Sequence, residues 1–127
     1  CDDCQETCPE NVRLFPTRRM ATQRESWVPV VGVLEEEDIT LERRVERWYV
    51  PGRDVNVVRR NALIVLGNVG DPANSEVRRT IDRYLRHEDE LLRAHAVWTA
   101  RRLGLHEMLA VHDDSELVMS ELRREYL

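Results

Sequence analysis

The feature that most constrains the fold is a helical period that runs through the second half of the chain. Residues 55–70, 75–87 and 89–105 each repeat apolar side chains every three or four positions and place arginines and acids between them. Asp54 stands where the first segment needs an N-cap, and glycine-containing turns end the first and third segments. No stretch of the chain has the alternation that is typical of a strand. The sequence therefore predicts an all-α fold.

The same period identifies the side chains that should face the core. We expect the three segments to bury, in chain order, Val57, Val58, Ala62, Leu63, Val65 and Leu66, then Val77, Ile81, Tyr84 and Leu85, then Leu92, Ala96, Trp98 or Thr99, and Leu103. A final helix is expected from Ser115 to the C-terminus, with Leu117, Val118, Leu122 and Tyr126 turned inward.

Two shorter helices are expected before residue 51. The first covers residues 27–34, with Pro29 in its first turn, and the second covers residues 38–50, with Asp38 as its cap. Pro51 and Gly52 would stop the second helix, whose expected inward residues are Ile39, Leu41, Val45, Trp48 and Tyr49. The chain then divides into a cysteine-containing segment, a connector with two short helices, and a helical domain, over residues 1–16, 17–50 and 51–127.

Two of the predicted helices resemble each other. A shift of 34 residues aligns VVRRNALIVL with LLRAHAVWTA, which places Arg59 over Arg93 and Asn61 over His95. Helix, turn and helix at this period are typical of α-helical repeats of the HEAT type. The alternative is a coincidence between two amphipathic helices that each carry arginine. We expect a HEAT-like helical repeat bundle.

All three cysteines of the chain lie within its first eight residues, as Cys1-x2-Cys4-x3-Cys8 followed by Pro9. An odd number of cysteines and the absence of a signal-peptide pattern argue against a disulfide framework. Zinc would usually need a second ligand pair at a fixed spacing, which the scattered histidines do not provide. The spacing matches the last three cysteines and the proline of the ferredoxin run C-x2-C-x2-C-x3-C-P. Cys1, Cys4 and Cys8 are therefore candidate ligands of four-iron clusters.

Three thiolates do not complete the four that one such cluster needs. We therefore expect this chain to be the C-terminal piece of a longer protein whose upstream part supplies the missing ligands. Zinc, or three reduced thiols without a metal, remain the alternatives for this segment. Because no apolar run is long enough to span a bilayer, we expect a cytoplasmic protein with no membrane partner.

Charge is distributed unevenly along the chain, although the net charge is only −5. Residues 43–102 contain thirteen arginines against eight acids, whereas residues 1–42 contain four against ten and residues 103–127 contain two against six. A basic block between acidic ends suits an anion-binding face, and ordinary charge-rich helices produce the same pattern by chance. All basic residues are arginine, for which genomic base composition is the simpler explanation.

Taken together, CDDCQETCPEN and a helical tail with RRNALIVLGNVGD and LLRAHAVW resemble the C-terminal part of the epoxyqueuosine reductase family. The resemblance covers nearly the whole chain and is weakest between residues 17 and 50. In that family a cobalamin-binding domain precedes a module with two four-iron clusters, and a HEAT-like helical domain closes the chain. The resemblance implies reduction of epoxyqueuosine to queuosine in tRNA, with electrons passing from a donor protein or reductant through the clusters to cobalamin.

The resemblance also assigns roles to residues. It makes Cys8 a ligand of the first cluster and Cys1 and Cys4 ligands of the second, and it places the catalytic acid and the cobalamin pocket in the upstream part, so no catalytic residue is assigned here. Basic helices of a tRNA-modifying enzyme would contact backbone phosphates. The candidate contacts are Arg59, Arg60, Asn61, Arg93 and His95. The alternative function is a helical protein-interaction module with a ferredoxin-type electron-transfer cluster and no RNA role.

Overall fold

The computed structural model describes residues 8–14, 28–46, 48–110 and 112–124. These residues form helices and contain no strand, which confirms the all-α prediction for the part of the chain described. The α-helices are α2 (Pro9–Leu14), α3 (Val30–Glu35), α4 (Asp38–Arg44), α5 (Val55–Val69), α6 (Ser75–Leu85), α7 (Glu90–Arg102) and α8 (Glu116–Arg123). The 3₁₀ turns η1 (Pro51–Arg53) and η2 (His106–Leu109) precede α5 and follow α7.

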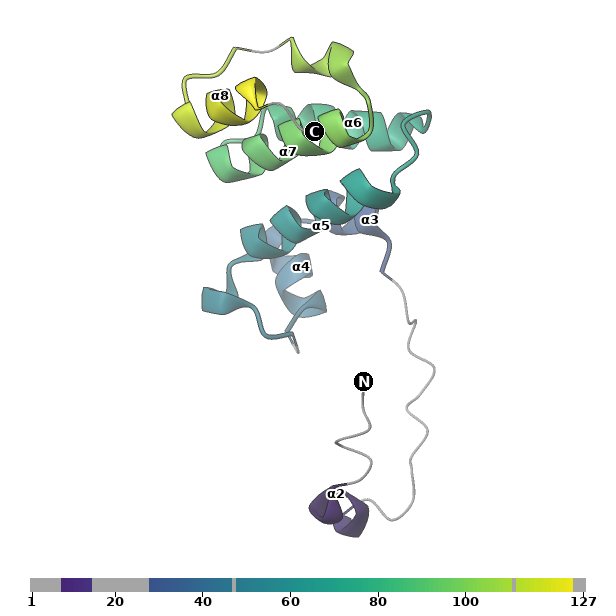
Figure 1. Cartoon of the computed structure of the whole chain (residues 1–127). Coiled ribbons are helices and arrows are strands. Elements are labelled where there is room, and N and C mark those ends of the chain that lie inside the picture. Colours follow the sequence, from purple (N-terminus) through teal and green to yellow (C-terminus); the bar gives the residue numbers. More distant parts are fainter. Residues whose placement is uncertain (1–7, 15–27, 47, 111, 125–127) are drawn as a thin grey trace.

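The helices from α3 onward pack around α5 and α7. α3 lies against α5, α6 lies against α7, and the two pairs meet where α5 contacts α7 and α3 contacts α6 (Figure 1). α8 covers another side of α7. α7 is therefore the central helix, and three of its alanines, Ala94, Ala96 and Ala100, are buried in these contacts. Small side chains on a central helix allow its neighbours to approach closely.

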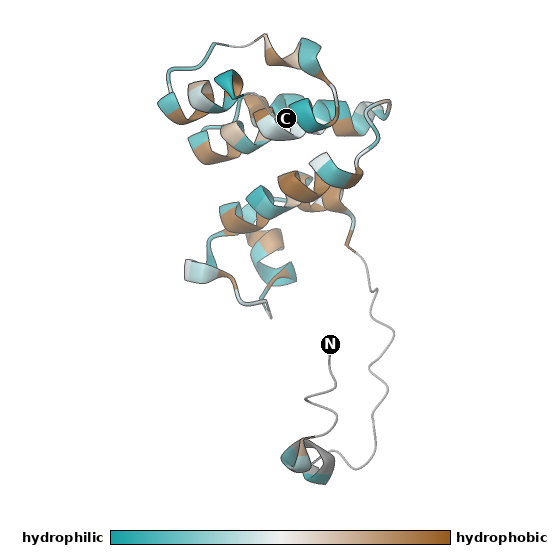
Figure 2. Ribbon diagram, in the orientation of Figure 1, coloured by the Kyte–Doolittle hydropathy of each residue, from teal (hydrophilic) through white to brown (hydrophobic). Residues whose placement is uncertain are grey.

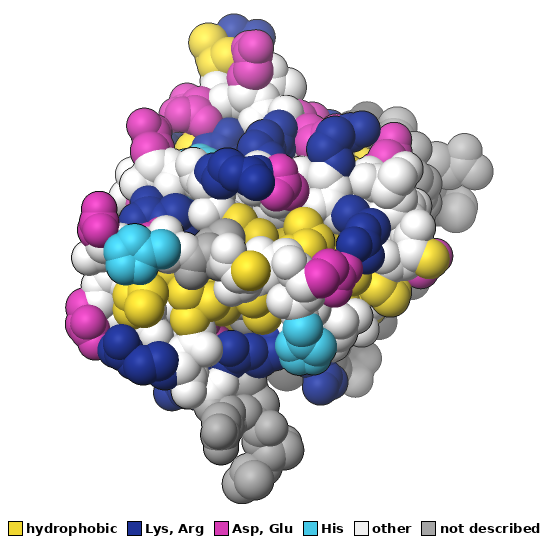
Figure 3. Space-filling view, turned by 90° about the horizontal axis from the view of Figure 1, so that it is seen from above, with side chains coloured by type: hydrophobic (Ala, Val, Ile, Leu, Met, Phe, Trp, Pro, Cys, Tyr) yellow, Lys and Arg dark blue, Asp and Glu magenta, His cyan; other side chains and the backbone are white. Residues whose placement is uncertain are grey.

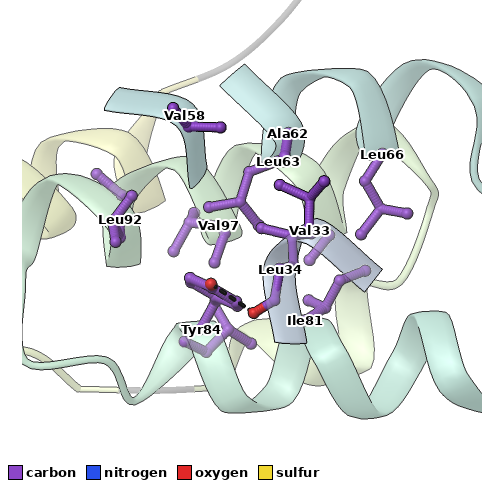
Figure 4. Packing of buried hydrophobic residues seen from close by; sticks show 14 of the residues in the cluster. Val33, Leu34, Val58, Ala62, Leu63, Leu66, Ile81, Tyr84, Leu92 and Val97 are labelled. Carbon is purple, nitrogen blue, oxygen red and sulfur yellow. Dashed lines mark hydrogen bonds between the residues drawn. The ribbon is translucent and has the colours of Figure 1, made fainter. Parts of the chain in front are cut away.

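One continuous apolar core joins the two pairs (Figure 4). Leu34 of α3, Leu63 of α5, Ile81 of α6 and Val97 of α7 are at most 1% exposed. Tyr84 is also buried, and its hydroxyl donates to the backbone oxygen of Leu34 at 2.8 Å. The hydrogen bond gives the one polar atom of this ring a partner, as a buried hydroxyl requires.

Side-chain caps fix where the main helices begin. Asp54 accepts from the amide of Asn56, as the sequence predicts, and Asn74, Asp89 and Ser115 cap α6, α7 and α8 in the same way. Each cap satisfies an amide that has no partner within its own helix. The prediction that Asp38 caps α4 is wrong, because Asp38 is the first helical residue and its carboxylate pairs with Arg59.

The contact between α5 and α7 is close at one position. A Cβ atom on Gly67 would lie 2.6 Å from the ring of Trp98, so glycine is required there by space. Leu63 lies four residues before Gly67 on α5. Its backbone oxygen accepts a hydrogen bond from the Thr99 hydroxyl at 2.9 Å, which also ties α7 to α5. The half-buried Trp98 and the buried Thr99 thus both take part in the packing that the sequence predicts for α7.

The burial of α5 and α7 follows the shift of 34 residues. Val58, Ala62, Leu63 and Leu66 are buried in α5, and the residues 34 positions later, Leu92, Ala96, Val97 and Ala100, are buried in α7. The two helices therefore present equivalent faces to the core. Whether this pattern is a HEAT-like repeat stays a prediction.

Several predicted core residues lie at the surface instead. α4 ends at Arg44 rather than near residue 50. Val50, the residue before Pro51, takes an extended conformation (φ −112°, ψ 115°), as the residue before a proline usually does. Predicted inward residues that are exposed are Ile39 (57%), Trp48 (50%), Tyr49 (94%), Val65 (48%) and Leu117 (45%). Figure 2 shows the consequence for α5, which carries hydrophobic residues over much of its length, including positions that do not face the core.

Candidate nucleic-acid interface

The predicted contact residues on α5 and α7 differ sharply in their surroundings. Arg59 is only 7% exposed. Its guanidinium donates to the backbone oxygen of Glu36 at 2.8 Å and to the side-chain oxygen of Asn56 at 3.3 Å, and it pairs with Asp38 at 2.6 Å. These partners hold the turn between α3 and α4 against α5. The burial and the polar contacts of Arg59 are therefore explained by partners within the protein.

Arg93 also has internal partners. Its guanidinium forms a two-point contact with the Asp113 carboxylate, at 2.7 and 3.0 Å, and donates to the backbone oxygens of His87 and Glu88. The side chains of Arg93 and Asp113 are 18% and 11% exposed. The Arg93 hydrogen bond holds the pKa of Asp113 below its ordinary value. The pair joins the start of α7 to the segment that leads into α8.

Arg60 and Asn61 lie on the outer side of α5. The Arg60 guanidinium donates to the Asn61 side-chain oxygen at 3.2 and 3.0 Å, and Asn61 is exposed. His95, on α7, makes a contact of 2.8 Å between its Nδ1 and the Leu91 backbone oxygen. The structure therefore does not bring the five candidate residues onto one surface. Arg60 and Asn61 are the two that contact each other.

Most arginines of the helical region pair with a carboxylate. Examples are Arg79 with Glu35 and Arg78 with Glu107, and the hydrogen bond from Arg79 lowers the pKa of Glu35. Figure 3 shows this mixture on one face, where arginine side chains lie beside Asp and Glu side chains around a band of hydrophobic ones. Within the described ranges, the arginines that have no carboxylate at ion-pair distance and no hydrogen bond to a backbone oxygen are Arg43, Arg53, Arg60 and Arg102.

Arg60 borders a hollow of about 550 Å³ between α3, α5 and the segment before η1. Seven valines line this hollow together with Ala62, Pro51, Trp48, Tyr49, Arg60 and Asn61, and we call it the valine hollow. Arg60 and Asn61 supply its polar side chains, and none of the described residues that line it is acidic. An open apolar hollow with a few polar groups at its edge is the usual form of a binding surface.

A second hollow, of about 370 Å³, is adjacent to the first, because Trp48, Tyr49 and Val50 line both. Its remaining lining consists of Glu42, Val45, Glu46 and Arg53, and we call it the glutamate hollow. The two aromatic side chains, Trp48 and Tyr49, thus form a ridge between a hollow without acids and a hollow with two. The helical spacing placed both aromatics in the core, whereas α4 ends at Arg44 and both side chains lie in the segment after it.

A third, polar hollow of about 280 Å³ contains Arg59, Arg83, Tyr84 and His87 among several acids. Arg83 donates to the Leu34 backbone oxygen, as Tyr84 does, and His87 stacks on the Tyr84 ring with 5.3 Å between centroids. Burial lowers the pKa of His87, and the nearby Arg59 and Arg83 lower it further against the opposing effect of Asp89 and Glu88. The groups in this hollow serve to hold the end of α3.

The predicted cluster ligands fall mostly outside the described residues. Cys1 and Cys4 lie there, whereas Cys8 is described and is half-buried, next to Pro9, the first residue of α2. Three thiolates are the donor type that iron–sulfur clusters take, and they are one fewer than a single four-iron cluster needs. The described ranges contain no group of three or more His, Cys, Asp or Glu side chains placed to hold a metal ion.

Comparison of the chain with models of protein families, with curated protein sequences and with solved structures finds no match in any of the three. The family resemblance therefore rests on the cysteine run and the helical motifs of the sequence itself. In the described part of the chain, no helix is both long enough and apolar enough to cross a membrane.

Proposed function

We propose that this chain is the C-terminal part of a cytoplasmic, cobalamin-dependent iron–sulfur reductase that converts epoxyqueuosine to queuosine in tRNA. In this proposal Cys1, Cys4 and Cys8 are cluster ligands, completed by residues upstream. The helices from α3 to α8 form a HEAT-like domain that docks on tRNA. Bound clusters would carry electrons from a donor protein or reductant toward the cobalamin of the upstream domain.

The observation that carries the proposal is the union, in one chain, of the Cys-x2-Cys-x3-Cys-Pro run with a pair-wise packed helical domain. The shared burial of α5 and α7 at a shift of 34 residues supports the repeat interpretation. Ferredoxin-type ligand loops serve electron transfer, and helical repeats provide extended binding surfaces. The two parts together therefore suit a redox enzyme that holds a large substrate.

Docking on tRNA is assigned to a smaller set than the sequence alone suggests. Arg59 and Arg93 act in this proposal as positioning residues, since their guanidinium groups already have partners within the protein. Arg60 is the arginine of the original set that retains donors for a phosphate, and Asn61 lies beside it. An arginine without a carboxylate partner is suited to bind phosphate, because no anion of the protein already neutralises its charge.

Salt-dependent binding of tRNA tests this docking role. The measurement is fluorescence anisotropy of a labelled, unmodified tRNA with the chain and with its Arg60→Gln variant, at several salt concentrations. Each lost phosphate contact should lower the slope of log K against log salt by about 0.7 to 0.9. Arg123→Gln is the matched control, because Arg123 is an exposed arginine that already pairs with Glu116. Absence of binding at low salt, or equal behaviour of the two variants, would remove the docking role.

The valine hollow favours a second candidate function. Its apolar lining also fits a helical protein-interaction module that carries a ferredoxin-type electron-transfer cluster and has no RNA role. The anisotropy measurement with tRNA also distinguishes the two functions, since only the first requires tRNA binding that weakens as the salt concentration rises.

A further inference from the structure

The aromatic ridge is the most unusual surface of the described chain. Tyr49 is 94% exposed and Trp48, directly before it, is 50% exposed. Single exposed apolar side chains are ordinary, but two adjacent exposed aromatic side chains form a contiguous apolar surface of the kind that marks an interaction site. Both side chains line the valine hollow and the glutamate hollow.

The charges around the ridge select the kind of ligand. The chain has more acids than arginines, yet neither Arg53 nor Arg60 has a carboxylate at ion-pair distance among the described residues. Each borders one of the two hollows that flank the ridge. Arg60 borders the hollow whose described lining has no acid, whereas Arg53 shares the glutamate hollow with Glu42 and Glu46. The valine side is therefore the one complementary to a ligand that combines a flat apolar face with negative charge.

The backbone at Arg53 supports a role for its side chain. Arg53 has φ 55°, in the left-handed region that disfavours residues with a Cβ, and it directly follows Gly52 at φ 64°. Asparagine or glycine would adopt this conformation at lower cost. A charged side chain held in a disfavoured conformation at the surface is the kind of outlier from which a functional constraint can be inferred.

We propose that the ridge and the valine hollow bind an unpaired base of single-stranded RNA. The base stacks on Tyr49 and Trp48, the Asn61 amide faces its edge, and Arg60 and Arg53 contact the flanking phosphates. Glu42 and Glu46, which line the same hollow as Arg53, repel the backbone. The base and the phosphate at Arg60 therefore lie on the valine side, and the phosphate at Arg53 lies at the edge of the glutamate hollow. This inference rests on the proposed docking of tRNA and narrows it to a loop rather than a paired stem.

The test compares two fluorescent RNAs of the same composition, a hairpin with an unpaired loop and a fully paired duplex. Binding to the chain is measured by anisotropy for the wild type and for Tyr49→Ala, Tyr49→Phe and Glu46→Gln. We expect the hairpin to bind more tightly than the duplex. Tyr49→Ala should weaken hairpin binding about tenfold, the loss that removal of one stacking platform causes, and Tyr49→Phe should retain it. Glu46→Gln should tighten binding of both RNAs.

The outcomes distinguish this inference from the function on which it rests. If tRNA and the hairpin bind but Tyr49→Ala binds the hairpin as the wild type does, the stacking site is refuted and tRNA docking stands. If neither RNA binds at low salt, both fail. If Tyr49→Ala leaves RNA binding unchanged and abolishes self-association seen in sedimentation, the ridge is a protein interface and the inference is overturned. Because Tyr49 is almost fully exposed, its replacement leaves the core intact.

Discussion

Arg59 and Arg60 are adjacent in the sequence, but only Arg59 is built into the protein. We consider methionine at each position, since methionine keeps an unbranched apolar stem and removes the guanidinium. At Arg59 the change leaves the backbone oxygen of Glu36 without its donor at 2.8 Å and removes the pair with Asp38. At Arg60 it removes only the contact with the exposed Asn61.

The expected difference in stability follows from these contacts. A hydrogen bond from a charged donor contributes about 1.5–3 kcal/mol, and the bond to the Glu36 oxygen is partly buried. The pair with Asp38 adds about 0.5 kcal/mol, a low value because the Asp38 side chain is 70% exposed and screened by water. Arg59→Met should therefore lower the free energy of unfolding by about 3 kcal/mol, whereas Arg60→Met should change it by less than about 0.5 kcal/mol.

Urea denaturation followed by circular dichroism measures both variants against the wild type. We expect a lower midpoint for Arg59→Met with an unchanged slope, because the loss is local and the surface exposed on unfolding stays the same. Equal midpoints for Arg59→Met and Arg60→Met would refute the argument that Arg59 holds the turn between α3 and α4. In that case Arg59 would again be available as a phosphate contact.

Three further predictions concern stability. The pKa of His87 is lowered in the folded state, so as the pH falls below 6.5 the unfolded state takes up a proton at His87 before the folded state does, and the free energy of unfolding should decline. His87→Asn should make this decline smaller in denaturation curves recorded between neutral pH and about pH 5. Gly67→Ala places a Cβ 2.6 Å from the Trp98 ring and should lower the free energy of unfolding by about 1–3 kcal/mol, with a red shift in tryptophan emission. Arg93→Met should leave the Asp113 carboxylate without its cation, raise the pKa of Asp113 toward its ordinary value and speed hydrogen exchange in α8, whereas unchanged exchange would contradict the role given to that pair.

The helical class and the main helix starts were predictable because they depend on local chemistry. Asp54 caps α5 through a side chain two residues from the amide it serves, and such contacts can be inferred from the sequence alone. The buried faces of α6 and α7 were predictable for the same reason, since an apolar stripe at helical spacing has one way to face a core.

Two features were not predictable from the local sequence pattern: which side of α5 is exposed, and which arginines have partners within the protein. Val65 has the spacing of a core residue, and only the position of neighbouring helices leaves it at the valine hollow. Arg59 and Arg93 have the composition of a basic surface, and only tertiary packing brings each to its partner, 23 residues away for the Glu36 oxygen and 20 residues away for Asp113. Long-range partners of this kind cannot be deduced from spacing.

The central claim is that the cysteine run holds iron–sulfur clusters in a longer reductase. Its most direct test is anaerobic analysis of iron and acid-labile sulfide in the complete polypeptide and in its Cys1/Cys4/Cys8→Ser variant. The account predicts iron and sulfide in about equal amounts, approaching eight irons for two four-iron clusters, with part or all of both lost in the variant. Zinc in place of iron, or no metal in either protein, would contradict the account and leave a helical binding domain without a redox role.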